Sequence, residues 1–556
     1  MTAADKLPGG PGAAAPGRVR SDVVPGVDPA TGAAVATSGV LLPRPQRVPA
    51  CPLPDLAALL GLPAPAVGPD AAPVMVSGVT HASATVRPGD VYAALPGTRR
   101  HGAEFADEAA AAGARALLTD PAGAAMIDGS TGAAADLPRL VVPDPRARLG
   151  EVAGRVYGDP TARLPVIGIT GTAGKTTAAY LVDAGLRAAG RHPALLGTVT
   201  TRLGDLVIDS VRTTPEATDL HALLAVAEER GVDAVVMEVS SHALVLGRVG
   251  GVRFAAGAYT NFGLDHLDFH ADVDDYFAAK ARLFDGRCAV EVLNHDDPAV
   301  VALRRAGTVT YSAAGDPAAT WRAEKVTTGS RAGDDGYVQH FTAVGPRGPV
   351  PAGVSAPGRH NVANALLAIA VLDAVGIEPA TVAAGVATAA GVPGRLERVD
   401  APGGGPLGVV DYAHKPDSIV AVLASLREVA RARDGRLICV LGAGGDRDTG
   451  KRAPMGAAAA RGADLVVVTD DNPRSEDPAA IRAEVLAGAR VTGGAAALEV
   501  AGRREAIGQA VRRARPGDVV AVLGKGHERG QEIAGEVHPF DDRTVLAEAL
   551  AAVVST

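Results

Sequence analysis

Hydrophobic runs that alternate with helical stretches organise most of the chain. In the middle third, short β-branched runs at 165–170, 234–240, 255–260 and 289–294 are separated by stretches with helical spacing. Strands that alternate with helices are typical of βαβ units and a parallel sheet. The last third repeats the pattern, with the runs LGVVDY, LICVLG, LVVVTD and VVAVLG between alanine-rich stretches. Each of these four runs ends in glycines and polar residues, and open parallel sheets bind ligands beyond the carboxyl ends of their strands.

The N-terminal third changes character near residue 45. Residues 1–45 are rich in Gly, Pro and Ala and lack aromatic side chains, so they cannot bury enough apolar surface to offset their ordering entropy. A short helix at 56–60, small strands and turns, and an alanine-rich helix at 103–112 then predict a compact α/β unit. We expect a disordered tail at 1–45, an N-terminal domain at 46–150, a central domain at 151–393 and a C-terminal domain at 394–556.

Composition and charge narrow the class of protein. A chain of 556 residues is too long for one core, and its 47% hydrophobic content excludes a wholly disordered protein. We find neither an apolar run near the ~20 residues of a membrane helix nor a signal-peptide pattern, which favours a soluble cytoplasmic protein. The net charge of −8 provides no broad surface for nucleic acid. Cys51, Cys288 and Cys439 are far apart, which favours packed, reduced thiols over disulfides or a zinc site.

The strongest local signal is a phosphate-binding loop. The strand predicted to end at Thr170 continues into GTAGKTT and then into a helix up to Gly190. Backbone N–H groups of such a turn and helix N-terminus favour an anion, with Lys175 on the outer phosphates and the Thr176 hydroxyl on a magnesium ion. The spacing is G-x-x-G-K-T, because Ile169 stands where the commoner motif has its first glycine. A strand-to-helix turn that only needs glycines is the alternative.

Acidic and histidine side chains follow the next two predicted strands. Glu238 ends one of them, where a carboxylate is well placed to hold magnesium opposite the phosphate loop. The next strand end supplies Asp265, His266, Asp268 and His270 in the run DHLDFH. By itself a solvated loop explains this run; its place one strand along from Glu238 favours a functional reading.

Eleven motifs, in this order, resemble the Mur ligases of peptidoglycan synthesis. They are GTAGKTT, MEVSSH, DHLDFH, YFAAKA, NHDDP, HNVANA, GRLE, DYAHKPDS, GGDRDTGKR, DDNPR and GKGHE. The resemblance runs from about Leu53 to the C-terminus and is strongest to the members that add meso-diaminopimelate. It implies an α/β fold of three domains: a small N-terminal UDP-binding domain, a central P-loop parallel-sheet ATPase domain and a C-terminal Rossmann-like domain. It also implies ATP and Mg²⁺ as cofactors.

The resemblance assigns residues to the two nucleotide-bearing substrates. The ATP site would comprise Gly171, Thr172, Ala173, Gly174, Lys175, Thr176, Thr177, Asn361, Asn364, Arg395 and Asp411. The UDP-muramoyl-dipeptide would be held by His81, Ser83, Thr98, Arg99, Arg100, Thr213, Thr214, Ser240 and Arg248. The family's Asp-Ser-Arg is Ala82-Ser83-Ala84 here, which leaves the uracil contacts open. A diphosphate needs cations, which agrees with Arg99 and Arg100, although a plain exposed turn also explains them.

The resemblance also implies a catalytic and metal-binding group. Its catalytic members would be Lys175, Glu238, His266 and Lys280, and magnesium would be held by Thr176, Glu238, His266 and carbamylated Lys280. Carbamylation turns a cation into a carboxylate, which could help to hold a second magnesium. By residue type alone, Lys280 is expected on the surface of a helix, so its role depends on the resemblance.

The third implied site takes diaminopimelate and comprises Arg447, Asp471, Asn472, Pro473, Arg474, Gly524 and Glu528. Diaminopimelate differs from lysine in a second amino-carboxylate end. A guanidinium, here Arg474, can bind that carboxylate bidentately, while Glu528 pairs with the ammonium. A site built around a buried Arg rejects lysine, because lysine leaves the charge unpaired.

The implied reaction is ATP-dependent ligation of meso-diaminopimelate to the D-Glu of UDP-N-acetylmuramoyl-L-alanyl-D-glutamate through an acyl phosphate. We expect domain closure over this intermediate, with a hinge near 391–394, because an acyl phosphate hydrolyses in water. The partners would be small molecules, without nucleic acid or membrane, and the protein a monomer. The alternatives are a lysine-adding or folylpolyglutamate-synthetase-like ligase, which the THAS motif and Arg474 disfavour, and a non-catalytic scaffold, which the intact Lys175, Glu238 and Lys280 disfavour.

Overall fold

The structure is a computed structural model that describes residues 26–27, 34–35, 42–64, 72–330, 337–401 and 405–554. Most of the tail predicted at 1–45 lies outside these ranges. The chain forms two compact units that alternate along the sequence. The first takes residues up to Val166, His192–Arg253 and His266–Ala279; the second takes Ile167–Arg191, Phe254–Asp265 and Lys280 to the end. The domain boundaries expected at 150 and 393 remain a prediction.

A four-stranded parallel sheet forms the N-terminal part of the first unit. Its strands have the order β5-β6-β7-β8, with bounds Gly78–Thr80, Asp90–Ala94, Ala116–Thr119 and Arg139–Val141. They pack with α1 (Leu53–Leu59), α2 (Ala106–Ala111), α3 (Pro121–Asp128) and α4 (Pro145–Val156) around cores rich in Ala, Val and Leu. The helix predicted at 103–112 starts as a 3₁₀ turn, Gly102–Phe105, capped by the His101 side chain. Arg44, within the predicted tail, bonds to the buried Asp90 carboxylate at 2.6 Å.

The rest of the first unit holds four strands in the order β12-β11-β10-β13. Their bounds are Leu206–Ile208, Thr201–Leu203, Pro193–Leu196 and Ala234–Glu238, and the flanking helices are α6 (Ala217–Glu229) and α7 (Ser241–Val245). β10 and β13 are parallel, and every residue of both is buried. Burial on both faces explains why the run at 234–237 is continuously apolar.

The second unit contains β9 (Val166–Thr170), the helix α5 (Lys175–Ala188) and a run of strands in the order β14-β15-β16-β17-β18-β19. The bounds of these six are Phe254–Tyr259, Cys288–Asn294, Val309–Ser312, Trp321–Ser330, Tyr337–Gly345 and Gly348–Val354. The strands predicted at 165–170, 255–260 and 289–294 are confirmed to within a residue or two. The antiparallel strands β17–β19 escaped prediction, because polar residues interrupt β17 and β18, glycines and prolines interrupt β19, and no long apolar run marks any of them.

Two helices pack beside these strands, α10 (Arg359–Ala374) and the shorter α11 (Pro379–Ala387). The helix α5 packs against both of them, and Leu372 and Val382 lie so close to Gly185 that a Cβ there would be within 3 Å of each. The helix predicted at 361–375 is confirmed as α10. α8 (Val273–Ala281) carries Lys280 near its C-terminal end.

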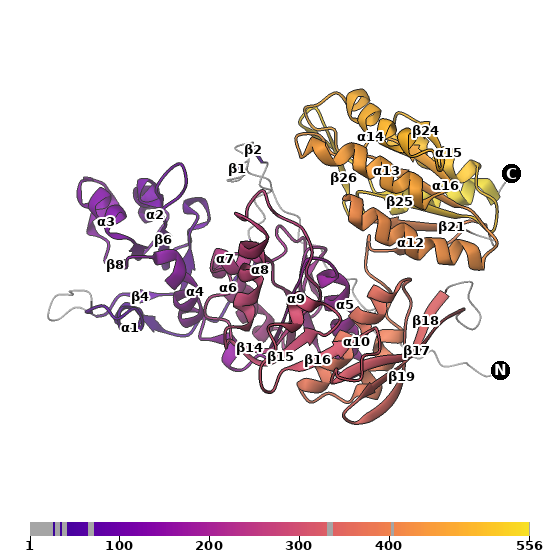
Figure 1. The fold of residues 1–556 in the computed structure, drawn as a ribbon. Helices are drawn as coiled ribbons and strands as arrows, with labels where there is room; N and C mark the ends of the chain where they lie inside the picture. The colour runs from indigo at the N-terminus through magenta and orange to yellow at the C-terminus, as the bar shows by residue number, and fades with distance from the viewer. Residues whose placement is uncertain are drawn as a thin grey trace, which may run out of the picture. The chain divides into compact units, whose positions relative to one another are not determined.

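The C-terminal part of the second unit, drawn in orange to yellow in Figure 1, contains a six-stranded sheet with helices packed on it. The strand order is β20-β21-β25-β22-β23-β24, and all strands except β20 are parallel. The strands span Glu397–Val399, Leu407–Asp411, Val519–Leu523, Leu437–Leu441, Leu465–Val468 and Ala496–Glu499, in that order. Helices α12 (Pro416–Ala432), α13 (Arg452–Gly462) and α14 (Pro478–Thr492) cover one face; α15 (Arg503–Arg512) and α16 (Asp542–Val554) cover the other. The parallel βαβ order and the Rossmann-like fold expected here are confirmed.

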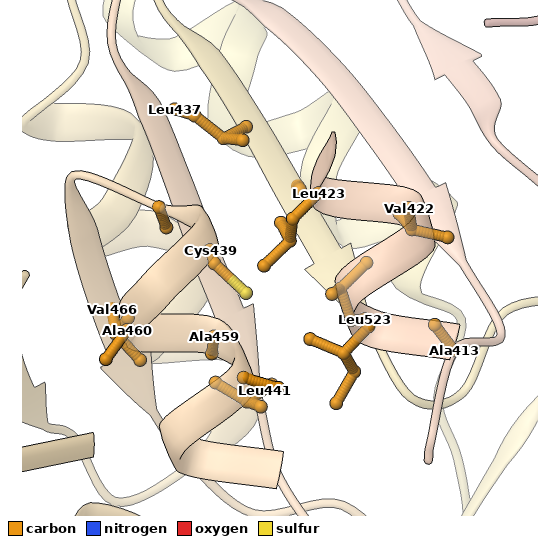
Figure 2. Packing of buried hydrophobic residues seen from close by; sticks show 14 of the residues in the cluster. Ala413, Val422, Leu423, Leu437, Cys439, Leu441, Ala459, Ala460, Val466 and Leu523 are labelled. Atoms are coloured by element: carbon orange, nitrogen blue, oxygen red, sulfur yellow. The ribbon is translucent and has the colours of Figure 1, made fainter. Parts of the chain in front are cut away.

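The side chains of each strand alternate between the two helical layers. Leu437, Cys439 and Leu441 face α12 and α13, as Figure 2 shows, whereas Ile438 and Val440 face α15 and α16. Cys51, Cys288 and Cys439 are free thiols, as expected; burial raises the pKa of Cys439 to about 12. In the described ranges, no helix is long and apolar enough to cross a membrane.

Glycines bring α13 and α14 into close contact. A Cβ on Gly456 would lie 1.9 Å from the Val485 carbonyl oxygen, and one on Gly488 would lie 1.9 Å from the Ala453 carbonyl oxygen. Real Cβ atoms do not approach an oxygen so closely, so any larger side chain would force the helices apart.

Candidate functional site

The phosphate loop joins β9 to α5, as the sequence predicts. Gly171 and Gly174 have φ angles of 145° and 83°, which an L side chain rarely adopts, so the turn needs both glycines. The Lys175 Nζ donates to the carbonyl oxygens of Gly171 at 2.7 Å and Thr172 at 3.1 Å. The ammonium group therefore lies over the loop, where the outer phosphates of a nucleotide would place negative charge.

The segment 260–263, which follows β14, supports the loop from beside it. Thr260 Oγ1 and Asn261 Nδ2 donate to the Ala173 carbonyl oxygen at 2.6 and 3.0 Å. Asn261 Oδ1 accepts from the Ala173 amide at 3.0 Å, and the Gly263 amide donates to Thr172 Oγ1 at 3.1 Å. Sequence reasoning missed these residues, although TNFG stands at the strand end where side chains of this kind are expected.

We predict that Gly171→Ala removes most ATP binding and destabilises the protein by about 1–3 kcal/mol. Its φ is 145°, and the added Cβ would lie 1.8 Å from Thr260 Oγ1. Equilibrium binding of a fluorescent ATP analogue and thermal unfolding measure the two effects. Gly190→Ala is the matched control, because Gly190 also has a positive φ but has nothing within 4 Å of its added Cβ. It should lose a little stability and no affinity; equal affinities for both variants would contradict the role of the loop.

Lys280 is not on the surface, so the expectation from residue type alone is wrong. Only 1% of the residue is exposed, and its Nζ donates to the Gly171 carbonyl oxygen at 2.9 Å. Burial lowers the pKa of Lys280 to about 6, with a further contribution from the charge of Lys175 and opposition from Asp265. The amine is therefore largely neutral at pH 7 and lies beside the phosphate loop, which residue type and spacing could not have shown.

The other predicted ATP residues in this unit lie on α10, just before β20 and at the end of β21. A Cβ on Gly174 would lie 2.8 Å from Asn364 Oδ1, which places Asn364 against the phosphate loop. Asn361 is buried and donates to the Pro357 carbonyl oxygen at 2.6 Å. Asp411 accepts from the amides of Leu396 at 2.7 Å and Ala413 at 2.8 Å, and burial raises its pKa. The guanidinium of Arg395 lies over the Tyr412 ring at 4.5 Å.

In the first unit, three of the predicted UDP residues line one cavity. A cavity of about 290 Å³ is lined by His81, Ser83 and Arg100, together with Tyr92, Phe105 and Arg146. Arg100 lies over the Phe105 ring at 4.3 Å and bonds to Glu104 at 2.8 Å. Thr98 and Arg99 are exposed residues of the adjoining turn and do not line it. Sequence reasoning missed Arg146, which supplies a second guanidinium and stands at the start of a helix, where no motif marks it.

The predicted muramoyl-dipeptide residues form a second cluster in the first unit, next to Glu238. Thr214 Oγ1 donates to the Glu238 carbonyl oxygen at 2.9 Å and accepts from the Ser240 amide at 3.1 Å. Ser240 caps α7. Arg248 pairs with Glu216 at 2.7 Å; burial alone would raise the pKa of Glu216, but Arg248 and other cations hold it below its usual value.

Glu238 is buried, with 1% of the residue exposed. Its carboxylate accepts from the Thr198 amide at 2.8 Å and from Thr198 Oγ1 at 3.3 Å, and Thr198 Oγ1 lies 3.0 Å from Thr213 Oγ1. Thr198 links the carboxylate to Thr213, one of the threonines predicted to bind the muramoyl-dipeptide, and the sequence reasoning missed Thr198.

The DHLDFH residues do not form a metal cluster of their own. His270 contacts Ser241 Oγ through Nε2 at 3.0 Å and Asp275 through Nδ1 at 3.1 Å, while Asp265 pairs with Lys415. Exposed His266 has a positive φ of 53° and lies edge-on to the His242 ring. Across the described ranges, no three His, Cys, Asp or Glu residues are grouped to hold a metal. A magnesium site does not need such a group, because Mg²⁺ takes one or two protein carboxylates and completes its shell with phosphate oxygens and water.

The predicted diaminopimelate residues converge at the carboxyl ends of β23 and β25. Asn472 Nδ2 donates to Glu528 at 3.0 Å, and Lys525 Nζ donates to both Asn472 Oδ1 at 2.9 Å and Glu528 at 3.0 Å. Arg474 donates to the Gly445 carbonyl oxygen at 2.6 Å and pairs with Glu532 at 3.2 Å. The result is a group of alternating charges, in which Arg474 can take a carboxylate and Glu528 an ammonium.

Backbone geometry at this site explains its glycine. A Cβ on Gly524, whose φ is 117°, would lie 2.4 Å from the Asp471 carboxylate. Pro473 precedes Arg474, which has a φ of 53° and pairs with Ile533 of the β26 (Gly530–Ile533) and β27 (Glu536–Pro539) hairpin. Arg447 is exposed. Lys525 and Glu532 were missed, although Lys525 stands inside the quoted GKGHE motif.

Three family models match the chain. They are the catalytic domain of the Mur ligase family at 75–157, the Mur ligase middle domain at 169–372 and the Mur ligase glutamate ligase domain at 394–526. The UDP-N-acetylmuramoyl-L-alanyl-D-glutamate–2,6-diaminopimelate ligase of Streptomyces coelicolor is 53% identical over 91% of this chain and 98% of its own length. The ligase of the same name from Corynebacterium glutamicum is 45% identical over 88% and 94%.

Solved structures agree with these relatives. A ligase of the same name superposes with a TM-score of 0.65 at 30% identity, over 91% of this chain and all of that one. A folylpolyglutamate synthase of Mycobacterium tuberculosis complexed with ADP has a TM-score of 0.54 at 21% identity, over 68% and 92%. The second likeness concerns the fold alone.

Proposed function

The chain belongs to the Mur ligase family, and we propose that it joins meso-2,6-diaminopimelate to UDP-N-acetylmuramoyl-L-alanyl-D-glutamate at the expense of ATP, in peptidoglycan precursor synthesis. The observation that carries the substrate choice is the Arg474, Asn472 and Glu528 group at the strand ends of the C-terminal sheet. The further proposals, that the protein is a cytoplasmic monomer acting only on small molecules, follow from the family resemblance and the net charge of −8.

The first step transfers the γ-phosphoryl group of ATP to the D-Glu carboxylate. The phosphate loop would bind the nucleotide through backbone amides, and the Lys175 Nζ would exchange its contacts with the Gly171 and Thr172 carbonyls for phosphate oxygens. Thr213, Thr214, Ser240 and Arg248 would hold the muramoyl-dipeptide. With the nucleotide and the dipeptide held in this way, the protein contributes to this step mainly by positioning the reactants and neutralising their charge.

Magnesium ions, when bound, neutralise the charge of the transferring phosphoryl group. The family resemblance assigns them Thr176, Glu238, His266 and carbamylated Lys280 as ligands, and we propose these residues on that ground. The fit depends on a buried carboxylate at Glu238 and a largely neutral amine at Lys280. Only a neutral amine can add to CO₂, so the lowered pKa supports the carbamate.

The second step is attack of the diaminopimelate amine on the acyl carbon of the acyl phosphate, which forms the amide bond, breaks the bond to the phosphate oxygen and releases inorganic phosphate and the amine proton. The distal carboxylate of the amino acid would bind to the Arg474 guanidinium, and the distal ammonium to Glu528. Lysine lacks that carboxylate and would leave the Arg474 charge without its ligand partner, which costs several kcal/mol of binding. The site therefore favours the diaminopimelate ligase over a lysine-adding or folylpolyglutamate-synthetase-like enzyme.

Release of ADP with the purified protein, coupled to NADH oxidation, tests this function. We expect turnover that requires UDP-muramoyl-dipeptide, ATP and meso-diaminopimelate together, and a kcat/KM for L-lysine at least about 10³-fold lower. Equal use of lysine would overturn the substrate assignment, and absence of turnover with either amino acid would overturn the ligase assignment.

A further inference from the structure

A fully buried ion pair lies beneath the proposed diaminopimelate site and belongs to none of the proposed substrate-binding residues. Arg503 begins α15 and Asp542 begins α16, and the side chains of both are 0% exposed. Their contact is bidentate, with Nε to Oδ1 at 2.7 Å and Nη2 to Oδ2 at 2.6 Å. Removing two charges from water costs several kcal/mol for each ion, so such a pair adds little net stability over apolar packing.

The remaining donors of Arg503 reach the backbone at two strand ends. Nη2 donates to the Leu523 carbonyl oxygen at 3.0 Å, and Nη1 to the Asp470 carbonyl oxygen at 3.3 Å. Leu523 is the last residue of β25 and precedes Gly524; Asp470 follows β23 and precedes Asp471. One guanidinium thus bonds to the residue before Asp471 and to the residue before Gly524, at the two strand ends that carry the proposed diaminopimelate site.

The contacts continue from these strand ends into the pocket. A Cβ on Gly524 would meet the Asp471 carboxylate at 2.4 Å and Arg503 Nη2 at 3.9 Å, so the two strand ends lie in direct contact. Gln531 donates to the Asp471 carbonyl oxygen at 2.6 Å, and Lys525 joins Asn472 to Glu528. A displacement of either strand end would therefore change the spacing between Arg474 and Glu528.

We propose that Arg503 is a positioning residue for the amino-acid site: with Asp542 it clamps the carboxyl ends of β23 and β25, and so sets the separation at which Arg474 and Glu528 receive the distal carboxylate and ammonium of the substrate. The proposal rests on the proposed function. It assigns Arg503 no contact with substrate, because the guanidinium is fully enclosed.

The double variant Arg503→Met with Asp542→Leu tests it, because replacing a buried ion pair with apolar side chains often leaves folding intact. We expect the KM for diaminopimelate to rise at least tenfold and its preference over lysine to fall at least tenfold, while the KM values for ATP and UDP-muramoyl-dipeptide change less than twofold. A purely structural pair would leave the preference between the two amino acids unchanged.

The matched control acts at the opposite ends of the same sheet. Arg436 precedes β22, and Asp518, which precedes β25, accepts from the Arg436 Nη2 at 2.7 Å and its amide at 2.7 Å; 2% of Asp518 is exposed. The variant Arg436→Met with Asp518→Leu should lower the unfolding temperature without altering the amino-acid preference. An equal loss of preference in this control would show general loosening of the sheet and overturn the proposal.

If the double variant does not fold, Asp542→Asn keeps the shape of the pair and removes its charge. This variant should raise the KM for diaminopimelate at least threefold and leave the KM for ATP nearly unchanged. A folded variant with wild-type preference overturns the positioning role. Failure of the wild-type protein itself to use diaminopimelate would instead overturn the proposed function, so the two failures are distinguishable.

Discussion

Replacing Lys280 with alanine is expected to abolish ligation, lowering kcat on the order of 10³-fold, while the protein remains folded. The buried Nζ lies 2.9 Å from the Gly171 carbonyl oxygen, so the changed group stands directly beside the phosphate loop. Loss of one charge-stabilising group at a transferring phosphoryl costs about 3–4 kcal/mol. Short carboxylates such as formate, which can occupy the space of the missing carbamate, should partly restore ADP release.

The pH dependence of the Lys280 modification follows from the lowered pKa of this lysine, about 6. The neutral amine attacks CO₂ and loses a proton to give the carbamate, so modification proceeds above pH 6 and falls as pH drops below that value, where the amine is protonated. Enzyme labelled with ¹³C-bicarbonate should show a carbamate carbon resonance that Lys280→Ala lacks. Lys325→Ala, which changes an exposed lysine of β17, is the control. Full activity of Lys280→Ala without any added carboxylate would exclude a role for the carbamate in ligation.

Arg474→Ala is expected to raise the KM for diaminopimelate on the order of 10²–10³-fold, because a partly buried charge pair is worth about 2–5 kcal/mol. ATP binding should change less than twofold, since none of the proposed nucleotide residues contacts this guanidinium. Steady-state ADP release at varied diaminopimelate concentration gives the KM, and calorimetry gives the affinity for ATP.

Two further variants separate charge from geometry at this site. Arg474→Lys keeps the charge but loses the bidentate fork and the Gly445 contact, so it should recover only a small part of the affinity. Arg490→Ala removes an arginine of comparable charge from α14, outside the site, and should change neither value. Equal loss of diaminopimelate and ATP binding in Arg474→Ala would contradict the proposed role.

The sequence predicted the parallel strands and the motif-bearing strand ends, because continuous apolar runs and glycine clusters report burial and turns directly. The family resemblance pointed to Lys280, but residue type and spacing could not predict its burial, because a single lysine on a helix carries no information about the long-range packing that buries it. The same limit hid Arg146, Thr198 and Lys525, whose roles depend on neighbours far away in the chain. The antiparallel strands β17–β19 were missed because their apolar residues are too interrupted to register as a strand pattern.

The close contact between α13 and α14 has a consequence for how this sequence can vary. At Gly456 and Gly488 the facing backbone leaves no space for even a methyl group. Substitutions at these two positions should therefore be rejected, whereas substitutions on the outward faces of both helices should be tolerated. Because every replacement of glycine adds volume, natural variants should show a fixed pair of glycines in otherwise variable helices. Such a pair would look like a catalytic signature in a comparison of relatives, yet its cause is steric.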